Sequence, residues 1–185
     1  IILDTINYNN KKFDILKSFA LKKDYILGKI RAFGIGIPYG SICYKWFNVG
    51  VKYKYDAKAL SLKDISGMNS AFQLTEKDLS NVGWLMYGDL KNYDKLVQDV
   101  NDVKNRPICA ETKSNFDCPR ESPKNMPVFH DGEIEERNGK KILHRYGGGC
   151  GFDECLFHNE LSLGDDGLLK VNEEQLYYFR TGVMY

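Results

Sequence analysis

The chain has 185 residues, of which 43% are hydrophobic, enough to bury one core but too few for two comfortable domains. Its 26 Lys and Arg residues nearly balance its 25 Asp and Glu residues, so the net charge is +1. Such a chain has no overall field that would draw it to nucleic acid, and we expect no nucleic-acid partner. Its apolar runs are far shorter than the roughly 20 residues of a membrane-spanning helix.

We predict a single domain over residues 1–185, with a helical and strand part over about 1–105 and a cysteine-containing lobe over about 106–185. The sequence starts at Ile1 without the charged and then apolar segments of a signal peptide. We therefore expect a leader upstream, either an export signal or a membrane anchor.

Apolar residues repeat every three or four positions between residues 11 and 33, among them Phe13, Leu16, Ile26 and Ile30. This spacing predicts an amphipathic helix whose lysines face water. From Val49 to 55, apolar and polar residues alternate, which predicts a half-buried strand.

A second helix is predicted from Thr75 to about residue 103. Thr75 and Asp78 have the spacing of a capping box, which satisfies free amides of the first helical turn. Gly83 and Gly88 lie inside this run, and we expect the helix to break or to pack closely there.

The clearest local signal is Asn138-Gly139, with residues 133–137 before it and 140–146 after it. Asn-Gly tolerates the positive φ angles of a type I′ turn, so these residues predict a β-hairpin. Asp165-Asp166-Gly167 predicts another turn, and residues 176–181 predict a closing strand.

These elements indicate an α+β fold in which two helices pack on one face of a mainly antiparallel sheet, with a disulfide-pinned C-terminal lobe. An N-terminal helix ahead of antiparallel strands and a cysteine-pinned end is similar in outline to the ectodomains of type IV pilins and pseudopilins. That resemblance implies a subunit of a surface or secretion assembly.

Four cysteines fall in a stretch rich in Gly, Pro and Asn: Cys109, Cys118, Cys150 and Cys155. Exported domains use disulfides to restrict the unfolded chain, so we predict two disulfides here. Four thiols allow three pairings, and we favour the local one, Cys109 with Cys118 and Cys150 with Cys155.

Metal binding is an alternative use of the same sulfur atoms. Cys150, Cys155 and His158 offer two thiolates and an imidazole close in sequence, with Cys109, Cys118, His130 or His144 to complete a tetrahedron. Zinc prefers such ligands. This alternative predicts a zinc-stabilised adaptor, although the paired Cys-x2-Cys motifs of common zinc sites are absent.

Nucleophilic catalysis is a further alternative. The sequence Gly40-Ser41-Ile42-Cys43-Tyr44-Lys45-Trp46-Phe47 resembles, with one inserted residue, the Gly-Ser-Cys-Trp-Ala-Phe context of papain-like cysteine proteases. The resemblance implies a cysteine hydrolase with Cys43 as nucleophile and His144 or His158 as base. Ile42 is a departure, because it shifts the thiol from the position that lowers its pKa.

Our leading hypothesis is an exported, extracytoplasmic and non-catalytic binding or structural module without a cofactor. Its partner would be another protein or further copies of its own chain. The aromatic residues Tyr177, Tyr178, Phe179 and Tyr185 are candidates for such contacts.

Overall fold

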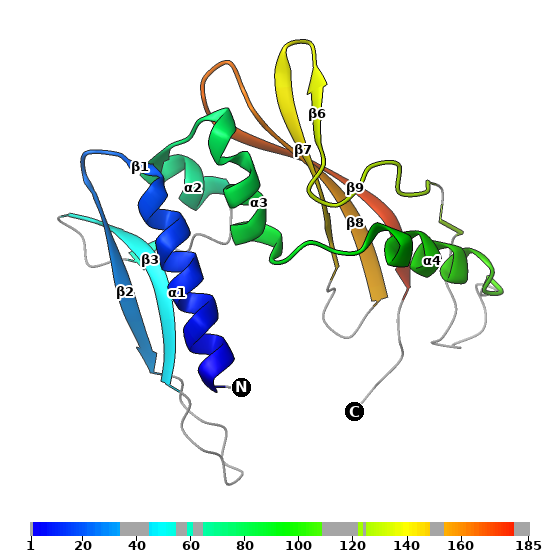
Figure 1. Ribbon diagram of the computed structural model, residues 1–185, viewed down its shortest axis with the longest axis horizontal. Coiled ribbons are helices and arrows are strands. Elements are labelled where there is room, and N and C mark those ends of the chain that lie inside the picture. Colours follow the sequence, from blue (N-terminus) through cyan, green and yellow to red (C-terminus); the bar gives the residue numbers. More distant parts are fainter. Residues whose placement is uncertain are drawn as a thin grey trace, which may run out of the picture.

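The computed structural model describes residues 2–33, 45–54, 59–60, 65–108, 122–123, 125–148 and 154–179. These residues form four α-helices and three antiparallel sheets (Figure 1). The fold therefore belongs to the α+β class, as the sequence predicts.

The N-terminal part is a helix, α1 (Ile2–Ser18), beside the sheet β2–β3–β4 (Figure 1). Its strands are β2 (Tyr25–Phe33), β3 (Lys45–Tyr53) and β4 (Ala59–Leu60). The prediction of a strand beginning at Val49 is confirmed, and that strand starts four residues earlier than expected.

The predicted helix over residues 11–33 is wrong beyond Ser18. The chain turns at Lys23 and Asp24 and then continues as β2, which pairs with β3 from Tyr25 to Phe33. Aromatic and β-branched residues favour a strand, and Gly28 disfavours a helix interior. Hydrogen bonding to β3 decides that residues 25–33 form a strand. The spacing of apolar residues within the segment does not reveal this distant partner.

Helices connect the N-terminal sheet to the C-terminal one. They are α2 (Ile65–Ala71), the 3-10 turn η1 (Glu76–Asp78), α3 (Leu79–Tyr87) and α4 (Tyr93–Lys104), with a small ribbon of β1 (Ala20–Leu21) and β5 (Phe72–Gln73).

The predicted second helix is confirmed as two helices. The Asp78 carboxylate accepts a hydrogen bond from the Thr75 amide at 2.8 Å, as expected of the capping box. Gly88 ends α3 with a φ of 78°, a conformation that favours glycine. Asn92 then caps α4 by accepting from the amides of its first turn.

The C-terminal sheet has the order β6–β7–β8–β9. Its strands are β6 (Ile134–Arg137), β7 (Lys140–Gly147), β8 (Glu154–Leu163) and β9 (Leu169–Phe179). The predicted hairpin is confirmed, with φ of 56° at Asn138 and 72° at Gly139. The turn at Gly167 is also confirmed, whereas β8 was not predicted and β9 starts before residue 176.

Helices cover both faces of this sheet, which corrects the expectation that all helices share one face. Leu143 packs into the core with α3, whereas Tyr146 belongs to a second cluster with α4 residues. Residues three apart on a strand project to opposite faces, so α3 and α4 lie on different sides.

The larger hydrophobic core joins the two parts of the chain. It contains Leu16 in the last turn of α1, Phe19 just after that helix, Val51 of β3, and Leu143 and Leu161 of the C-terminal sheet. Burying these side chains together is the main force that can hold the elements around α2 and α3.

Four of the five cysteines, Cys43, Cys109, Cys118 and Cys150, lie outside the described residues. Cys155, on β8, is 6% exposed and disulfide-bonded. The pairing and the pinned lobe therefore stay predictions. Within the described ranges, no helix has the length and apolar character needed to cross a bilayer.

Candidate functional site

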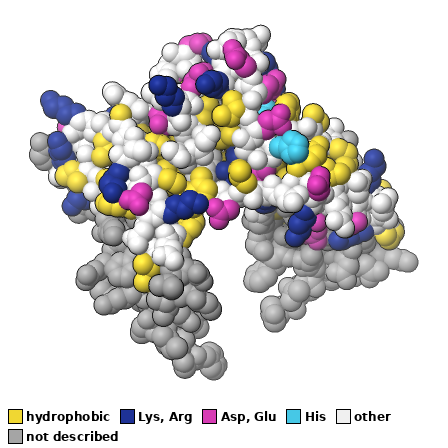
Figure 2. Space-filling model, in the orientation of Figure 1, with side chains coloured by type: hydrophobic (Ala, Val, Ile, Leu, Met, Phe, Trp, Pro, Cys, Tyr) yellow, Lys and Arg dark blue, Asp and Glu magenta, His cyan; other side chains and the backbone are white. Residues whose placement is uncertain are grey.

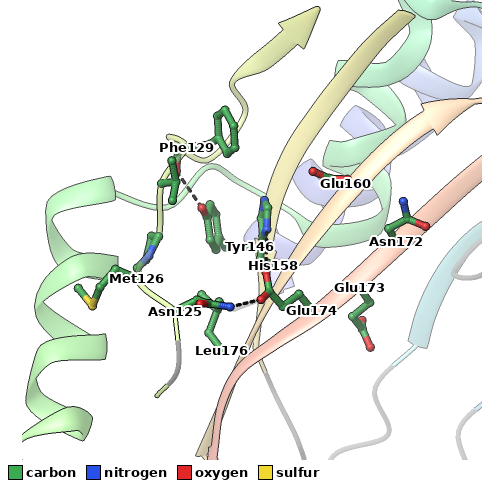
Figure 3. A pocket seen from close by; sticks show the side chains of 12 residues that line it. Asn125, Met126, Phe129, Tyr146, His158, Glu160, Asn172, Glu173, Glu174 and Leu176 are labelled. Atoms are coloured by element: carbon green, nitrogen blue, oxygen red, sulfur yellow. Dashed lines mark hydrogen bonds and ion pairs between the residues drawn. The ribbon is translucent and has the colours of Figure 1, made fainter. Parts of the chain in front are cut away.

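A pocket of about 470 Å³ lies on the α4 side of the C-terminal sheet (Figure 3). Residues 125–129 form one side of it, and Tyr146, His158, Glu160 and Leu176 contribute from β7, β8 and β9. The space-filling view shows histidine, acidic and hydrophobic side chains together over this part of the molecule (Figure 2).

The two sides of the pocket differ in polarity. Residues 126–129 supply Met, Pro, Val and Phe side chains, while β8 and β9 supply the carboxylates of Glu160 and Glu174. Glu173 contributes to the lining, but its side chain points away from the pocket, as strand alternation requires (Figure 3). None of the described lining residues is a Lys or Arg.

Side chains of α4 and β7 hold the 125–129 segment in place. The Tyr93 hydroxyl donates to the Pro127 carbonyl oxygen at 2.8 Å, and the Tyr146 hydroxyl donates to that of Phe129 at 2.9 Å. The Asn125 amide donates to the Glu174 carboxylate on β9 (Figure 3). These three hydrogen bonds are spread over the segment and hold it beside the sheet, with the pocket between the segment and the sheet.

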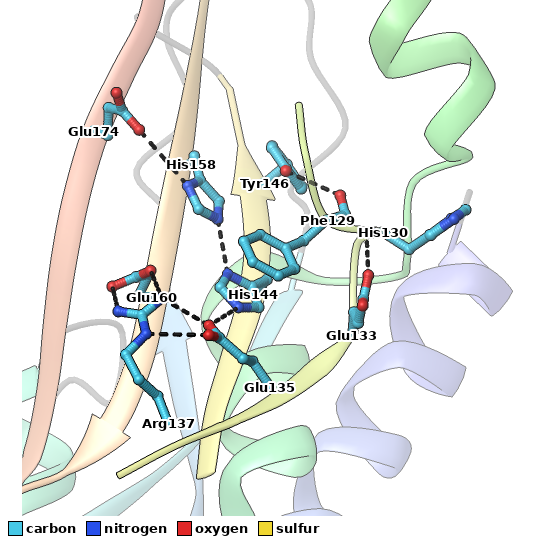
Figure 4. A network of polar contacts seen from close by, with 10 residues as sticks. All are labelled: Phe129, His130, Glu133, Glu135, Arg137, His144, Tyr146, His158, Glu160 and Glu174. Carbon is cyan, nitrogen blue, oxygen red and sulfur yellow. Dashed lines mark hydrogen bonds and ion pairs between the residues drawn. The ribbon is translucent and has the colours of Figure 1, made fainter. Parts of the chain in front are cut away.

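A pair of histidines lies beside the pocket on the same face of the sheet (Figure 4). Nδ1 of His144 is 3.0 Å from Nε2 of His158, and Nε2 of His144 is 3.2 Å from a carboxylate oxygen of Glu135. The Phe129 ring stacks on His144 at 3.7 Å between centroids. His144 is fully buried, so these partners fix the orientation of its ring.

Burial, followed by the charge of His144, holds the pKa of His158 below its ordinary value. The Glu160 and Glu174 carboxylates oppose this effect without reversing it. Burial also raises the pKa of Tyr146 to about 12. Near neutral pH, therefore, the His158 imidazole is mainly neutral and the Tyr146 hydroxyl keeps its proton, so neither group brings a charge to the pocket.

Arg137 joins two carboxylates at the edge of the histidine pair. Its Nη2 lies 2.6 Å from Glu135 and 3.0 Å from Glu160. The hydrogen bond from Arg137 lowers the pKa of Glu135. Glu160 thus lines the pocket while both of its carboxylate oxygens accept hydrogen bonds from Arg137, Oε1 at 3.0 Å and Oε2 at 3.5 Å.

The structure brings together the two histidines that the sequence proposes as bases. Both rings have partners on their two nitrogens, but the His158 side chain is 13% exposed whereas that of His144 is 0% exposed, so His158 is the more accessible imidazole. Cys43 lies outside the described residues, so its relation to either histidine stays a prediction.

Cys150, the first ligand of the predicted zinc site, also lies outside the described residues. Cys155 and His158 lie three residues apart on the continuous strand β8, so their side chains project to opposite faces of the sheet. A sulfur held in a disulfide, as that of Cys155 is, does not act as a thiolate ligand.

Sequence reasoning missed the acidic members of the site, Glu135, Glu160 and Glu174, and the aromatic Phe129. A usable signal existed in His158-x-Glu160, because alternate residues of a strand share a face. That signal needs β8 to be recognised as a strand first.

The fold and the site thus define an α+β protein with an acidic, partly aromatic pocket beside a pair of histidines, of which His144 is buried. Comparison of the chain with protein-family models, curated proteins and solved structures gives no significant match.

Proposed function

We propose that this protein is an exported, non-catalytic binding module that holds a basic side chain of a protein partner in the pocket on the C-terminal sheet. The observation that carries the proposal is the charge of the pocket: Glu160 and Glu174 face it, and no Lys or Arg is among its described lining residues. A ligand with an ammonium or guanidinium group would complement this charge.

The shape and polarity of the pocket support a lysine or arginine side chain in particular. Such a side chain has an apolar stem and a charged end. The stem would lie along Met126 and Phe129, and the charged end would reach Glu174. A volume of about 470 Å³ is within the usual range of ligand pockets, about 300–1,000 Å³.

The aromatic rings at the site favour the same ligand. Tyr146 lines the pocket and stacks near His158, with 4.9 Å between ring centroids. A cation close to the face of an aromatic ring is attracted by the negative charge of that face. The Phe129 carbonyl oxygen accepts from the Tyr146 hydroxyl and the Phe129 ring stacks on His144, so both rings are positioned before a ligand binds.

The exported location rests on sulfur chemistry. Cys155 is disulfide-bonded. Disulfides persist in oxidising compartments. We keep Cys150 as the proposed partner, and peptide mapping by mass spectrometry without reductant tests it: a linked Cys150–Cys155 peptide is expected, and five free thiols would contradict export.

Binding is tested by isothermal titration with two short peptides that differ only in charge. One carries a single lysine between glycines with both ends blocked, and the other carries norleucine in its place. We expect the lysine peptide to bind at least about fivefold more tightly, because norleucine keeps the stem and lacks the ammonium group.

Two variants locate the site. Glu174→Gln removes a carboxylate that faces the pocket and should weaken lysine-peptide binding about fivefold. Glu173→Gln is the matched control, since it removes the same charge one residue away on the other face of β9. Equal effects of the two substitutions, or equal affinity for the two peptides, would refute the proposal.

A further inference from the structure

Three strands of the C-terminal sheet bring metal-ligating atoms together beside the pocket. Glu135 of β6, His144 of β7 and Glu160 of β8 each place a ligand atom within 4.8 Å of the others (Figure 4). The register explains this, because His144 pairs directly with Glu160. Directly paired residues of an antiparallel sheet share a face.

We propose that Glu135, His144 and Glu160 form a binding site for one divalent transition-metal ion, for which zinc is the appropriate probe. Two carboxylates and an imidazole supply three ligands, the number that open zinc sites take from protein. An imidazole ligand favours zinc over magnesium and calcium, which prefer oxygen alone. This site goes beyond the proposed peptide binding and requires no peptide.

The surroundings of His144 support a ligand role. Metal-binding histidines usually have a hydrogen-bond partner on the second ring nitrogen, which fixes the tautomer and the ring orientation. Here Nδ1 of His144 pairs with Nε2 of His158, and Nδ1 of His158 lies 3.8 Å from Glu174. Phe129 stacked on His144 restricts rotation of the ring as well.

The histidine pair can accept a metal by moving protons along this chain. With both rings neutral and no metal, Nε2–H of His144 donates to Glu135, and Nε2–H of His158 donates to Nδ1 of His144. With a metal on Nε2 of His144, its Nδ1–H donates to Nε2 of His158, whose own proton moves to Nδ1 and faces Glu174. The two rings hold two protons in both states, so charge and atoms balance.

When no metal is bound, the positive charge near Glu135 and Glu160 is supplied by the Arg137 guanidinium. It pairs with both carboxylates, yet it supplies only one positive charge to two negative ones. Its side chain is 44% exposed, so the guanidinium can turn into water when a divalent ion binds. Arg137 is thus a competitor of the ion, and its removal should strengthen metal binding.

Zinc titration of the full chain, with calcium as a second ion, tests the site by calorimetry. We expect one zinc ion per chain at this site and at least about tenfold weaker binding of calcium. Glu160→Gln should weaken zinc binding at least about tenfold, since loss of a supporting group alone costs about 10–100-fold. Unchanged zinc binding in this variant would overturn the proposal, whatever other groups bind zinc.

Arg137→Gln provides the opposite prediction, a rise in zinc affinity of about threefold or more. Lys140→Gln is its matched control: it removes a positive charge from the same hairpin, but Lys140 pairs with Asp165 at 2.6 Å and not with the site. Both side chains are half exposed, so we expect both variants to fold. Equal effects on zinc affinity would contradict a direct competition by Arg137.

Nitrogen NMR of the histidine rings supplies a readout that a purely structural ion pair would not give. Zinc should shift the protonated nitrogen of His144 from Nε2 to Nδ1 and that of His158 from Nε2 to Nδ1. Zinc binding that leaves both tautomers unchanged would place the ion elsewhere and overturn the proposal. The zinc experiments contain no peptide. A failure of the metal site therefore leaves the peptide-binding proposal standing, and a failure of the peptide titrations leaves the metal site standing.

Discussion

Asp131 and Arg145 form a buried ion pair in which Arg145 Nε donates to Asp131 Oδ1 at 2.6 Å. The two residues are 7% and 1% exposed. Asp131 also accepts from the Lys91 amide, and Arg145 donates to the Gly88 carbonyl oxygen. Through this pair, two segments are attached to β7. One is the connection between α3 and α4, and the other is the chain that follows the pocket segment 125–129.

We predict that Asp131→Ala lowers the free energy of unfolding by about 3–5 kcal/mol, because Arg145 would remain buried without its partner. The double variant Asp131→Ala/Arg145→Met should recover part of that loss, since it removes the uncompensated charge. Urea unfolding measures both. A single-variant effect below about 1 kcal/mol would show that the pair does not fix this region.

An exposed ion pair serves as control for that experiment. Lys140 and Asp165 lie 2.6 Å apart, but the Asp165 side chain is 93% exposed. Asp165→Asn should leave the free energy of unfolding nearly unchanged, because water screens an exposed pair. A loss as large as that of Asp131→Ala would mean that burial does not distinguish the two pairs.

Gly83 is the point of closest approach between α3 and β7. A Cβ atom there would lie 2.6 Å from Leu143 Cδ2 and 3.3 Å from Arg145 Cγ, and both side chains are buried. We predict that Gly83→Ala destabilises the protein by about 1–3 kcal/mol, although alanine is the better helix former.

Ser80→Ala is the control for this prediction, because Ser80 is exposed on the same helix. It should be neutral or slightly stabilising in thermal unfolding, through helix propensity alone. If Gly83→Ala behaved in the same way, the tight packing of α3 on β7 would be wrong.

Tyrosine ionisation gives a prediction for alkaline pH. Burial raises the pKa of Tyr87 to about 12, with smaller effects from Glu173 and Arg145. The unfolded chain loses this proton near the ordinary pKa of about 10, so folding binds more protons between pH 10 and 12. The stability that Tyr87 contributes is therefore complete below pH 10 and is lost as pH rises toward 12.

Urea unfolding at several pH values between 9 and 11 measures this effect. One such group can contribute a slope of at most about 1.4 kcal/mol per pH unit. Tyr87→Phe should make the decline less steep than in the unmodified protein. Identical slopes would show that Tyr87 ionises as freely in the folded protein as in the unfolded one.

The sequence predicted those parts of the fold that short-range chemistry determines. Asn138-Gly139 specifies its turn within two residues, and Thr75 with Asp78 specifies a helix start within four. The strand at residues 25–33 was not predictable in this way, since its hydrogen bonds go to β3, across residues distant in sequence. The apolar period over residues 11–33 fitted a helix equally well.

The candidate site was less predictable because its members come from different strands. Glu135, His144 and Glu160 meet only through the register of β6, β7 and β8. The sequence identified His144 and His158 as chemically interesting, but their contact depends on β8, which was not predicted. Phe129 precedes the predicted hairpin, in a segment for which the sequence predicted no element.

The most direct test of the central claim is an NMR titration of the protein with the lysine peptide, observing contacts between the peptide and the rings that border the pocket. The claim is that a cationic side chain enters between the aromatic side and Glu174. We predict nuclear Overhauser contacts from the lysine methylene protons to Phe129 and Tyr146, and markedly weaker ones from the norleucine peptide at the same concentration. Contacts at another surface, or equal contacts from both peptides, would contradict the claim.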